Sequence, residues 1–168
     1  MKINNLWGCI LSMMIFAGCR SVQDIPAVDG FVLDKYLGKW YEIYRLPNWF
    51  ESGMSQVSAE YFLLENGNIR VINRGIKDGM VKTVYGYARF RDRKDSGELE
   101  VSFFRPFYAA YRIIKLAPDY RYSVVVSANK KYLWILSRNP QLSQSDRFEI
   151  FSFLKKQKFP VEKLIEGQ

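Results

Sequence analysis

The sequence predicts an all-β fold: an eight-stranded antiparallel up-and-down barrel with one C-terminal α-helix packed against its outside. Two observations lead to this prediction. Eight short runs alternate between apolar and polar residues, and a short connection joins each run to the next. After residue 142 the apolar spacing becomes helical. Closure of such a meander into a barrel removes its exposed edges. An open sandwich of two sheets also fits the pattern.

Turn-forming residues separate the eight runs. Asn66-Gly67 indicates a two-residue hairpin because both residues tolerate positive φ. Residues 77–79 and 118–119 carry further turn signals. The predicted strands therefore span residues 40–45, 57–63, 69–74, 84–90, 98–103, 108–116, 122–128 and 132–138.

The predicted helix covers residues 143–156. Phe148, Phe151 and Leu154 recur at helical spacing, so we expect this side of the helix to pack on the barrel. Ser143 opens a group of side chains whose oxygens can cap the first turn.

Residues 1–18 have the composition of a lipoprotein signal peptide. Lys2 precedes an apolar run at residues 6–16, and small residues stand directly before Cys19. This arrangement resembles a bacterial lipobox, in which the cysteine becomes the lipidated first residue of the mature chain. An ordinary signal peptide that contains a cysteine is the alternative.

The lipidated Cys19 and a polar linker would occupy residues 19–30, followed by a single domain at residues 31–168. Arg20 stands where an inner-membrane retention signal usually has aspartate, so we expect an anchor in the outer membrane, on its periplasmic side. Cys9 leaves with the signal peptide, so the domain has no disulfide framework and depends on packing and strand pairing.

The composition argues against catalysis. The chain has no histidine, and Cys19 is the only thiol position outside the leader. The commonest general base, a cysteine nucleophile and the usual zinc ligands are therefore missing. We expect no enzymatic activity, no metal and no cofactor. The formal net charge of +8 would suit nucleic acid, but an exported, lipid-anchored chain meets anionic lipid head groups instead, so we expect no nucleic-acid partner.

Strand alternation also predicts which side chains point into the barrel. The set is mostly apolar and aromatic, which suits an acyl chain, although core packing explains any single member equally well. Four residues are candidates to hold a head group near the mouth, namely Tyr44, Asn73, Tyr108 and Tyr111, and two of the first loop are candidates for the entrance, Phe50 and Met54. The remaining candidates are Tyr61, Val71, Val101, Phe103, Trp134 and Leu136.

Three elements resemble the signatures of the lipocalin family, in the family's order. Gly38-x-Trp40 opens the first strand, Asp119-Tyr120 lies between the sixth and seventh, and Arg138 ends the eighth. The resemblance implies that Arg138 packs across Trp40 at the closed end of the barrel, with Gly38 beside them.

Four longer blocks are similar to those of bacterial outer-membrane lipocalins. They lie at residues 40–43, 71–75, 101–108 and 132–138, and the resemblance extends over residues 30–165. It implies that the barrel binds long-chain fatty acids or lysophospholipids and serves membrane lipid upkeep. It also allows a homodimer. The alternative is an envelope lipoprotein with a filled barrel, in which exposed Trp49, Phe50 and Phe107 contact a protein partner.

Overall fold

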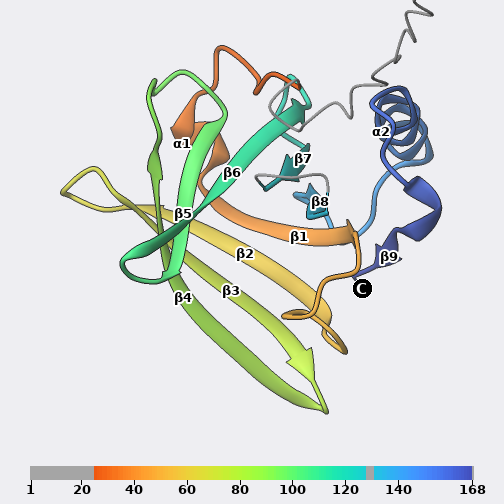
Figure 1. Cartoon of the computed structure of the whole chain (residues 1–168), viewed down its shortest axis with the longest axis horizontal. Helices are drawn as coiled ribbons and strands as arrows, with labels where there is room; N and C mark the ends of the chain where they lie inside the picture. Colours follow the sequence, from red (N-terminus) through yellow and green to blue (C-terminus); the bar gives the residue numbers. More distant parts are fainter. Residues whose placement is uncertain (1–24, 128–130, 168) are drawn as a thin grey trace, which may run out of the picture.

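The computed structural model describes residues 25–127 and 131–167. Its strands form one antiparallel sheet that closes on itself, because β1 (Gly38–Arg45) pairs with both its neighbours, β2 (Ser55–Leu63) and β8 (Leu133–Ser137) (Figure 1). The other strands pair in sequence order, which confirms the predicted eight-stranded up-and-down barrel. They are β3 (Ile69–Lys77), β4 (Met80–Phe90), β5 (Glu98–Phe104), β6 (Phe107–Leu116) and β7 (Tyr122–Val126).

The β3–β4 hairpin is longer than the alternation predicted. β4 begins at Met80 instead of residue 84, and its register with β3 runs to the pair Lys77–Met80. In the described register, β5 joins β4 only from Tyr87 onward. Residues 80–86 therefore extend beyond β5 at one end of the barrel, which we call the open end.

A short helix, α1 (Leu33–Tyr36), covers the other, closed end of the barrel. It was not predicted, because four residues are too few to show a period. Its C-terminal Tyr36 packs on Trp40, with ring centroids 4.7 Å apart, and the Tyr36 carbonyl accepts a 2.8 Å hydrogen bond from the Trp40 indole. α1 thus fixes the first strand at the closed end.

Arg138, which directly follows β8, contacts both α1 and the start of β1 at this closed end. Its guanidinium lies 3.9 Å from the centre of the Trp40 ring and donates to the carbonyls of Lys39 at 2.8 Å and Lys35 at 2.6 Å. Gly38 adopts a φ of +87°, and a Cβ at this position would lie 3.6 Å from the guanidinium.

The barrel interior holds one of the two hydrophobic clusters of the described residues. Trp40 and Ile113 are completely buried within it. The interior cluster consists of Phe31, Tyr36, Trp40, Tyr61, Ile69, Val71, Ala88, Leu99, Ile113, Tyr120, Val125 and Leu136.

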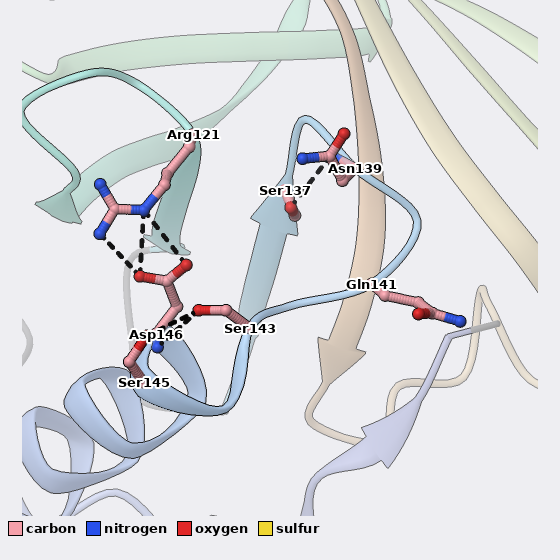
Figure 2. Close-up of a pocket in the computed structure, with 7 residues that line it drawn as sticks. All are labelled: Arg121, Ser137, Asn139, Gln141, Ser143, Ser145 and Asp146. Atoms are coloured by element: carbon pink, nitrogen blue, oxygen red, sulfur yellow. Dashed lines mark hydrogen bonds and ion pairs between the residues drawn. The ribbon is translucent and has the colours of Figure 1, made fainter.

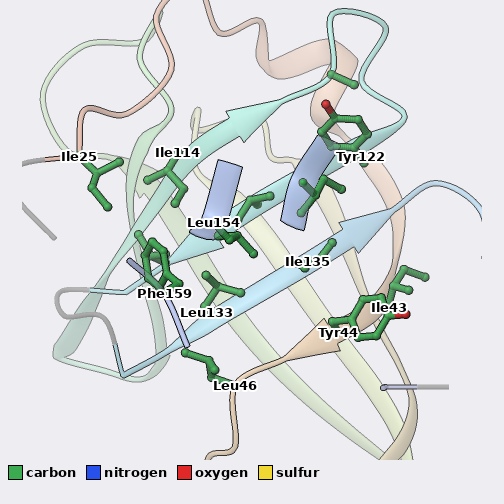
Figure 3. Packing of buried hydrophobic residues seen from close by; sticks show 14 residues of the cluster. Ile25, Ile43, Tyr44, Leu46, Ile114, Tyr122, Leu133, Ile135, Leu154 and Phe159 are labelled. Atoms are coloured by element: carbon green, nitrogen blue, oxygen red, sulfur yellow. The ribbon is translucent and has the colours of Figure 1, made fainter. Parts of the chain in front are cut away.

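The second cluster lies outside the barrel, beneath α2 (Gln144–Lys156), as Figure 3 shows. Ile150 and Leu154 of the helix are fully buried against the outer faces of β1, β7 and β8. The Ser143 hydroxyl accepts the Asp146 amide at 3.0 Å and so caps the first turn. The helix outside the barrel is confirmed, but its buried face differs from the expectation, because Phe148 faces solvent and Ile150 takes the central position.

Segments on either side of the barrel complete the fold. After α2, a 3-10 turn, η2 (Val161–Lys163), leads to β9 (Ile165–Glu166), which pairs with β1. Before α1, Val28 exchanges backbone hydrogen bonds with Ile113 and Gly97, so part of the segment expected to be a linker packs on the barrel. In the described part of the chain, no helix is long and apolar enough to span a membrane.

Candidate functional site

The floor of the barrel interior is a hydrogen-bonded group of tyrosines. The Tyr111 hydroxyl lies 2.7 Å from that of Tyr36 and 2.9 Å from that of Tyr61, and Tyr36 also meets the Ser123 hydroxyl at 3.2 Å. Burial raises the pKa of Tyr36 to about 12 and raises the pKa of Tyr61 and Tyr111 as well. The three phenols therefore stay neutral, and the floor is uncharged at physiological pH.

Apolar side chains cover the inner face above this floor. Val71 and Leu136 are buried there, and Val101 and Trp134 pack against the same cluster. All four were predicted from alternation to point inward. The structure brings them together with Tyr61 and Tyr111 in one continuous surface.

Toward the open end, this inner surface becomes accessible. Phe103 is 42% exposed and Val84 is 47% exposed, although both share the inner side of the sheet with buried neighbours. Phe103 lies over Gly86, where a Cβ would come within 2.7 Å of the ring. Gly86 thus makes room for the aromatic ring at the point where the interior meets solvent.

Asn73 places an unsatisfied polar atom on this inner surface. Its side-chain oxygen is buried and has no hydrogen-bond partner among the described residues. Asn73 stands opposite Ala59 on one side and Val84 on the other in the sheet register. A buried amide oxygen without a partner costs free energy, so this position favours a ligand with a polar group.

The first loop reaches the open end from β1. The Met54 methyl occupies the space over Gly75, where a Cβ would lie 2.7 Å from it. Phe50 packs near Tyr132 and Trp134, with ring centroids 5.7 Å and 6.4 Å away. Both entrance candidates of this loop therefore lie close to inner-surface residues.

A buried ion pair holds the base of this loop. Arg45 donates to the Glu42 carboxylate at 2.6 Å and to the backbone carbonyl of Met54 at 3.1 Å. The Trp134 indole donates to the Glu51 carboxylate at 3.0 Å. The pKa of Glu42 is raised to about 7. Burial is the largest cause and the nearby charge of Glu51 the second, whereas Arg45 lowers the pKa.

Two head-group candidates lie outside the barrel, which differs from their expected place at the mouth. A bulge between Glu42 and Tyr44 shifts the β1 register, so Tyr44 joins the outer cluster, where its ring meets Phe151 of α2. Tyr108 stands an odd number of residues from the inward Tyr111, and Arg89 stacks on its ring at 4.2 Å on the outer face.

Sequence reasoning missed some residues of the inner surface. Val84 and Lys82 follow the same alternation as Gly86, so the strand period could have identified them. Lys82 stands opposite Gly75, on the inner side of the open end, and is exposed. Tyr36 precedes the first strand, and no pattern in the sequence marks it.

A separate polar pocket of about 300 Å³ lies on the surface at the closed end, between the barrel and the start of α2 (Figure 2). Its charged groups are engaged with one another: Arg121 donates to Asp146 at 2.7 Å and to Asp119 at 2.9 Å. Its lining consists of Arg121, Ser137, Asn139, Gln141, Ser143, Ser145 and Asp146. These contacts attach α2 to the barrel, so the pocket has a structural explanation. Among the described residues, no group of three or more His, Cys, Asp or Glu could hold a metal ion.

The family model of the lipocalin-like domain matches residues 29–168. The chain belongs to the lipocalin family. One relative is apolipoprotein D of Rattus norvegicus, which is 40% identical to this lipocalin over 126 residues. The matched region covers 70% of this lipocalin and 66% of that protein.

Bacterial relatives match nearly the whole lipocalin. Outer membrane lipoprotein Blc of Vibrio cholerae serotype O1 is 39% identical over 163 residues, 95% of each chain. The protein of the same name in Escherichia coli K12 is 38% identical over 170 residues, 98% of this chain and 96% of that one. These matches support an outer-membrane, lipid-anchored location for this lipocalin.

Solved structures agree on the fold. Insecticyanin from the tobacco hornworm Manduca sexta superposes with a TM-score of 0.72 at 20% identity, over 86% of this lipocalin and 84% of that chain. The fold class predicted from the sequence is confirmed.

Proposed function

We propose that this lipocalin binds a long-chain fatty acid or a lysophospholipid in the open end of its barrel, and stores or transports it for membrane maintenance. One observation carries the proposal: an apolar inner surface runs from the tyrosine floor to half-exposed Phe103 and Val84, with the unpaired Asn73 oxygen within it. A binding role also fits a chain without histidine, in contrast to catalysis.

The inner surface suits an acyl chain in its chemistry and energy. Transfer of about sixteen carbons from water contributes roughly 12 kcal/mol, at ~0.8 kcal/mol per methylene. Association costs roughly 4 to 15 kcal/mol in lost freedom. At the low end of this cost about 8 kcal/mol remains, which corresponds to micromolar affinity. Tyr44 and Tyr108 are excluded from the proposed lipid contacts because they lie on the outer side of the barrel. The proposed contacts are Phe50, Met54, Tyr61, Val71, Asn73, Val101, Phe103, Tyr111, Trp134 and Leu136.

Two polar groups are suited to the head group of the lipid. Asn73 can accept a hydrogen bond from a glycerol hydroxyl or, with its amide rotated, donate to a carboxylate. Lys82, on the inner side of the open end, offers a positive charge to a carboxylate or phosphate. The anionic or hydroxyl-bearing end of the ligand would therefore lie toward solvent and its acyl chain toward the floor.

Cys19 would attach the protein to the membrane through a covalent lipid. This residue and the proposed signal peptide at residues 1–18 lie outside the described residues. The membrane anchor and the ligand site are separate proposals, since the first depends on processing and the second on the barrel.

Native mass spectrometry of residues 20–168 tests the ligand proposal, with oleate and lysophosphatidylcholine added separately. Both hydrophobic clusters and every strand pairing lie within residues 25–167, so this chain keeps the described fold. We expect a one-to-one complex with at least one of the lipids.

The matched variants are Trp134→Glu on the inner surface and Phe148→Glu on the exposed side of α2. Trp134→Glu should abolish the complex, whereas Phe148→Glu should retain it. Absence of both complexes at high micromolar lipid, or equal loss in the two variants, would refute a barrel site.

A further inference from the structure

Large apolar side chains face solvent at three turns of the open end. Trp49 in the β1–β2 connection is 81% exposed, and Phe104 and Phe107 around the β5–β6 turn are 77% and 71% exposed. Met80 and Val81 occupy the tip of the β3–β4 hairpin. We call this set the rim patch, defined as Trp49, Phe50, Met80, Val81, Phe104 and Phe107. Figure 1 shows the three connections on the lower side of the view, away from α1 and α2.

Folding of the barrel does not account for the rim patch. None of its members belongs to the interior or the outer cluster of the described residues. Trp49 lies edge-on to Phe50 at 5.6 Å, and Phe104 stacks on Phe107 at 6.4 Å. Phe50 is the member that also contacts the barrel, through Tyr132 and Trp134. Exposed apolar groups on three separate turns at one end of a molecule indicate an apolar partner.

The charges around the rim patch are mostly positive. Lys82, Arg105 and Lys131 are exposed at the same end of the barrel. Asp78 is an exposed acid in the β3–β4 turn, whereas the carboxylate of Glu51 turns toward Trp134. Aromatic and aliphatic tips beside basic side chains match the boundary between the acyl and head-group layers of an anionic bilayer.

The position of the described N-terminus agrees with a bilayer at this end. The Ile25 carbonyl accepts a hydrogen bond from the Arg112 side chain. Phe107, where β6 begins at the open end, stands five residues before Arg112, so about 17 Å of strand separates these two residues. Residues 19–24 can span about 20 Å when extended. A lipid on Cys19 and the rim patch can therefore reach the same membrane surface.

We propose that the rim patch docks this lipocalin, open end first, on the surface of an anionic phospholipid bilayer. Trp49, Phe104 and Phe107 insert between the head groups, while Lys82 and Arg105 pair with phosphates. This docking does not depend on a lipid inside the barrel. It would place the inner surface directly at the membrane, so that a bound lipid would not have to cross water.

Flotation of residues 20–168 with vesicles tests the docking surface. The vesicles are phosphatidylcholine alone and phosphatidylcholine mixed with phosphatidylglycerol, each at low and high salt. We expect the protein to float with the mixed vesicles, more strongly at low salt. We also expect its tryptophan emission, to which exposed Trp49 contributes, to shift to the blue. A triple variant, Trp49→Ser with Phe104→Ser and Phe107→Ser, should lower the partition coefficient by about tenfold or more.

The matched control is Phe148→Ser, which removes an aromatic ring that is 76% exposed on α2. All variants alter exposed side chains, and their unfolding transitions check that the barrel is intact. Failure of the wild type to float with the mixed vesicles would overturn the proposal, as would equal partition of the triple variant and the control. A dimer in ultracentrifugation that the triple substitution dissociates, without vesicle binding, would assign the rim patch to a second copy instead.

Discussion

The Arg138 guanidinium lies 3.9 Å from the centre of the Trp40 ring and donates hydrogen bonds to the backbone carbonyls of Lys39 in β1 and Lys35 in α1, so the end of β8 is fastened to the start of the barrel. The contact combines stacking on the indole with a fork of two hydrogen bonds, which a lysine cannot reproduce. The closed end therefore depends on the shape of this side chain as well as its charge.

Arg138→Lys should lower the free energy of unfolding by about 2 kcal/mol, because it removes the stacking and at least one carbonyl contact. Trp40→Ala should cost about 3 to 5 kcal/mol, since the ring is completely buried. Urea denaturation measures both. Arg93→Lys, in an exposed pair with Asp95, is the control and should leave stability unchanged. An unchanged midpoint for Trp40→Ala would contradict this account of the closed end.

Glu42 should make the protein less stable as the pH rises from about 4.5 to about 7. Its pKa is about 7 in the folded state and ordinarily 4.5, so between these values the folded chain holds a proton that the unfolded chain has released. The contribution of Glu42 to stability is therefore largest below this window, and about 3 kcal/mol of it is lost across the window.

Glu42→Gln isolates this effect, because carboxyl groups distant from Glu42 titrate equally in both proteins. Urea denaturation at several pH values should show that the difference between wild type and variant changes across the window. A difference that stays constant with pH would mean that Glu42 remains ionised beside Arg45.

Tyr111→Phe should lower the free energy of unfolding by about 1 to 3 kcal/mol, because the hydroxyls of Tyr36 and Tyr61 both contact the Tyr111 hydroxyl. Tyr108→Phe supplies the matched control, since that ring lies on the outer face of the same strand. Equal thermal stability of the two variants would show that the tyrosine floor adds nothing to the fold.

Asn73→Leu should change stability and binding in opposite directions. Removal of the buried, unpaired oxygen should raise the free energy of unfolding of the ligand-free protein by about 1 kcal/mol. Lipid affinity should fall about tenfold, through loss of one head-group hydrogen bond. Calorimetric titration with oleate and lysophosphatidylcholine measures the affinity. Thr83→Leu, on the outer side of the neighbouring strand, is the control; an unchanged affinity for Asn73→Leu would remove this residue from the site.

The sequence predicted the strands and the family because both depend on repeated local signals. Alternation located β2 to β8, and spaced signatures joined Trp40 to Arg138. The position of Tyr44 could not be predicted, because one extra residue in the β1 bulge turns the following side chains to the other face. Tyr36 lies in a four-residue helix without a period, and the face of α2 was misjudged because Phe148 and Ile150 are both apolar.

The rim could be predicted only in part. Trp49, Phe50 and Phe107 follow from their loop positions in the sequence. Met80 and Val81 did not, because the polar Lys82 and Thr83 hid the first half of β4 from the alternation. The length of the hairpin depends on pairing with β3, which a single strand does not reveal.

Because α2 covers only part of the outer face of the barrel, the strands differ in how tightly they are packed. Strands β1, β6, β7 and β8 are packed on both faces, whereas the outer cluster takes no described side chain from β2, β3, β4 or β5. One side is therefore stiff and the other can flex without disturbing α2. Fluctuations that admit or release the proposed lipid would occur on the flexible side, while the stiff side keeps the chain folded.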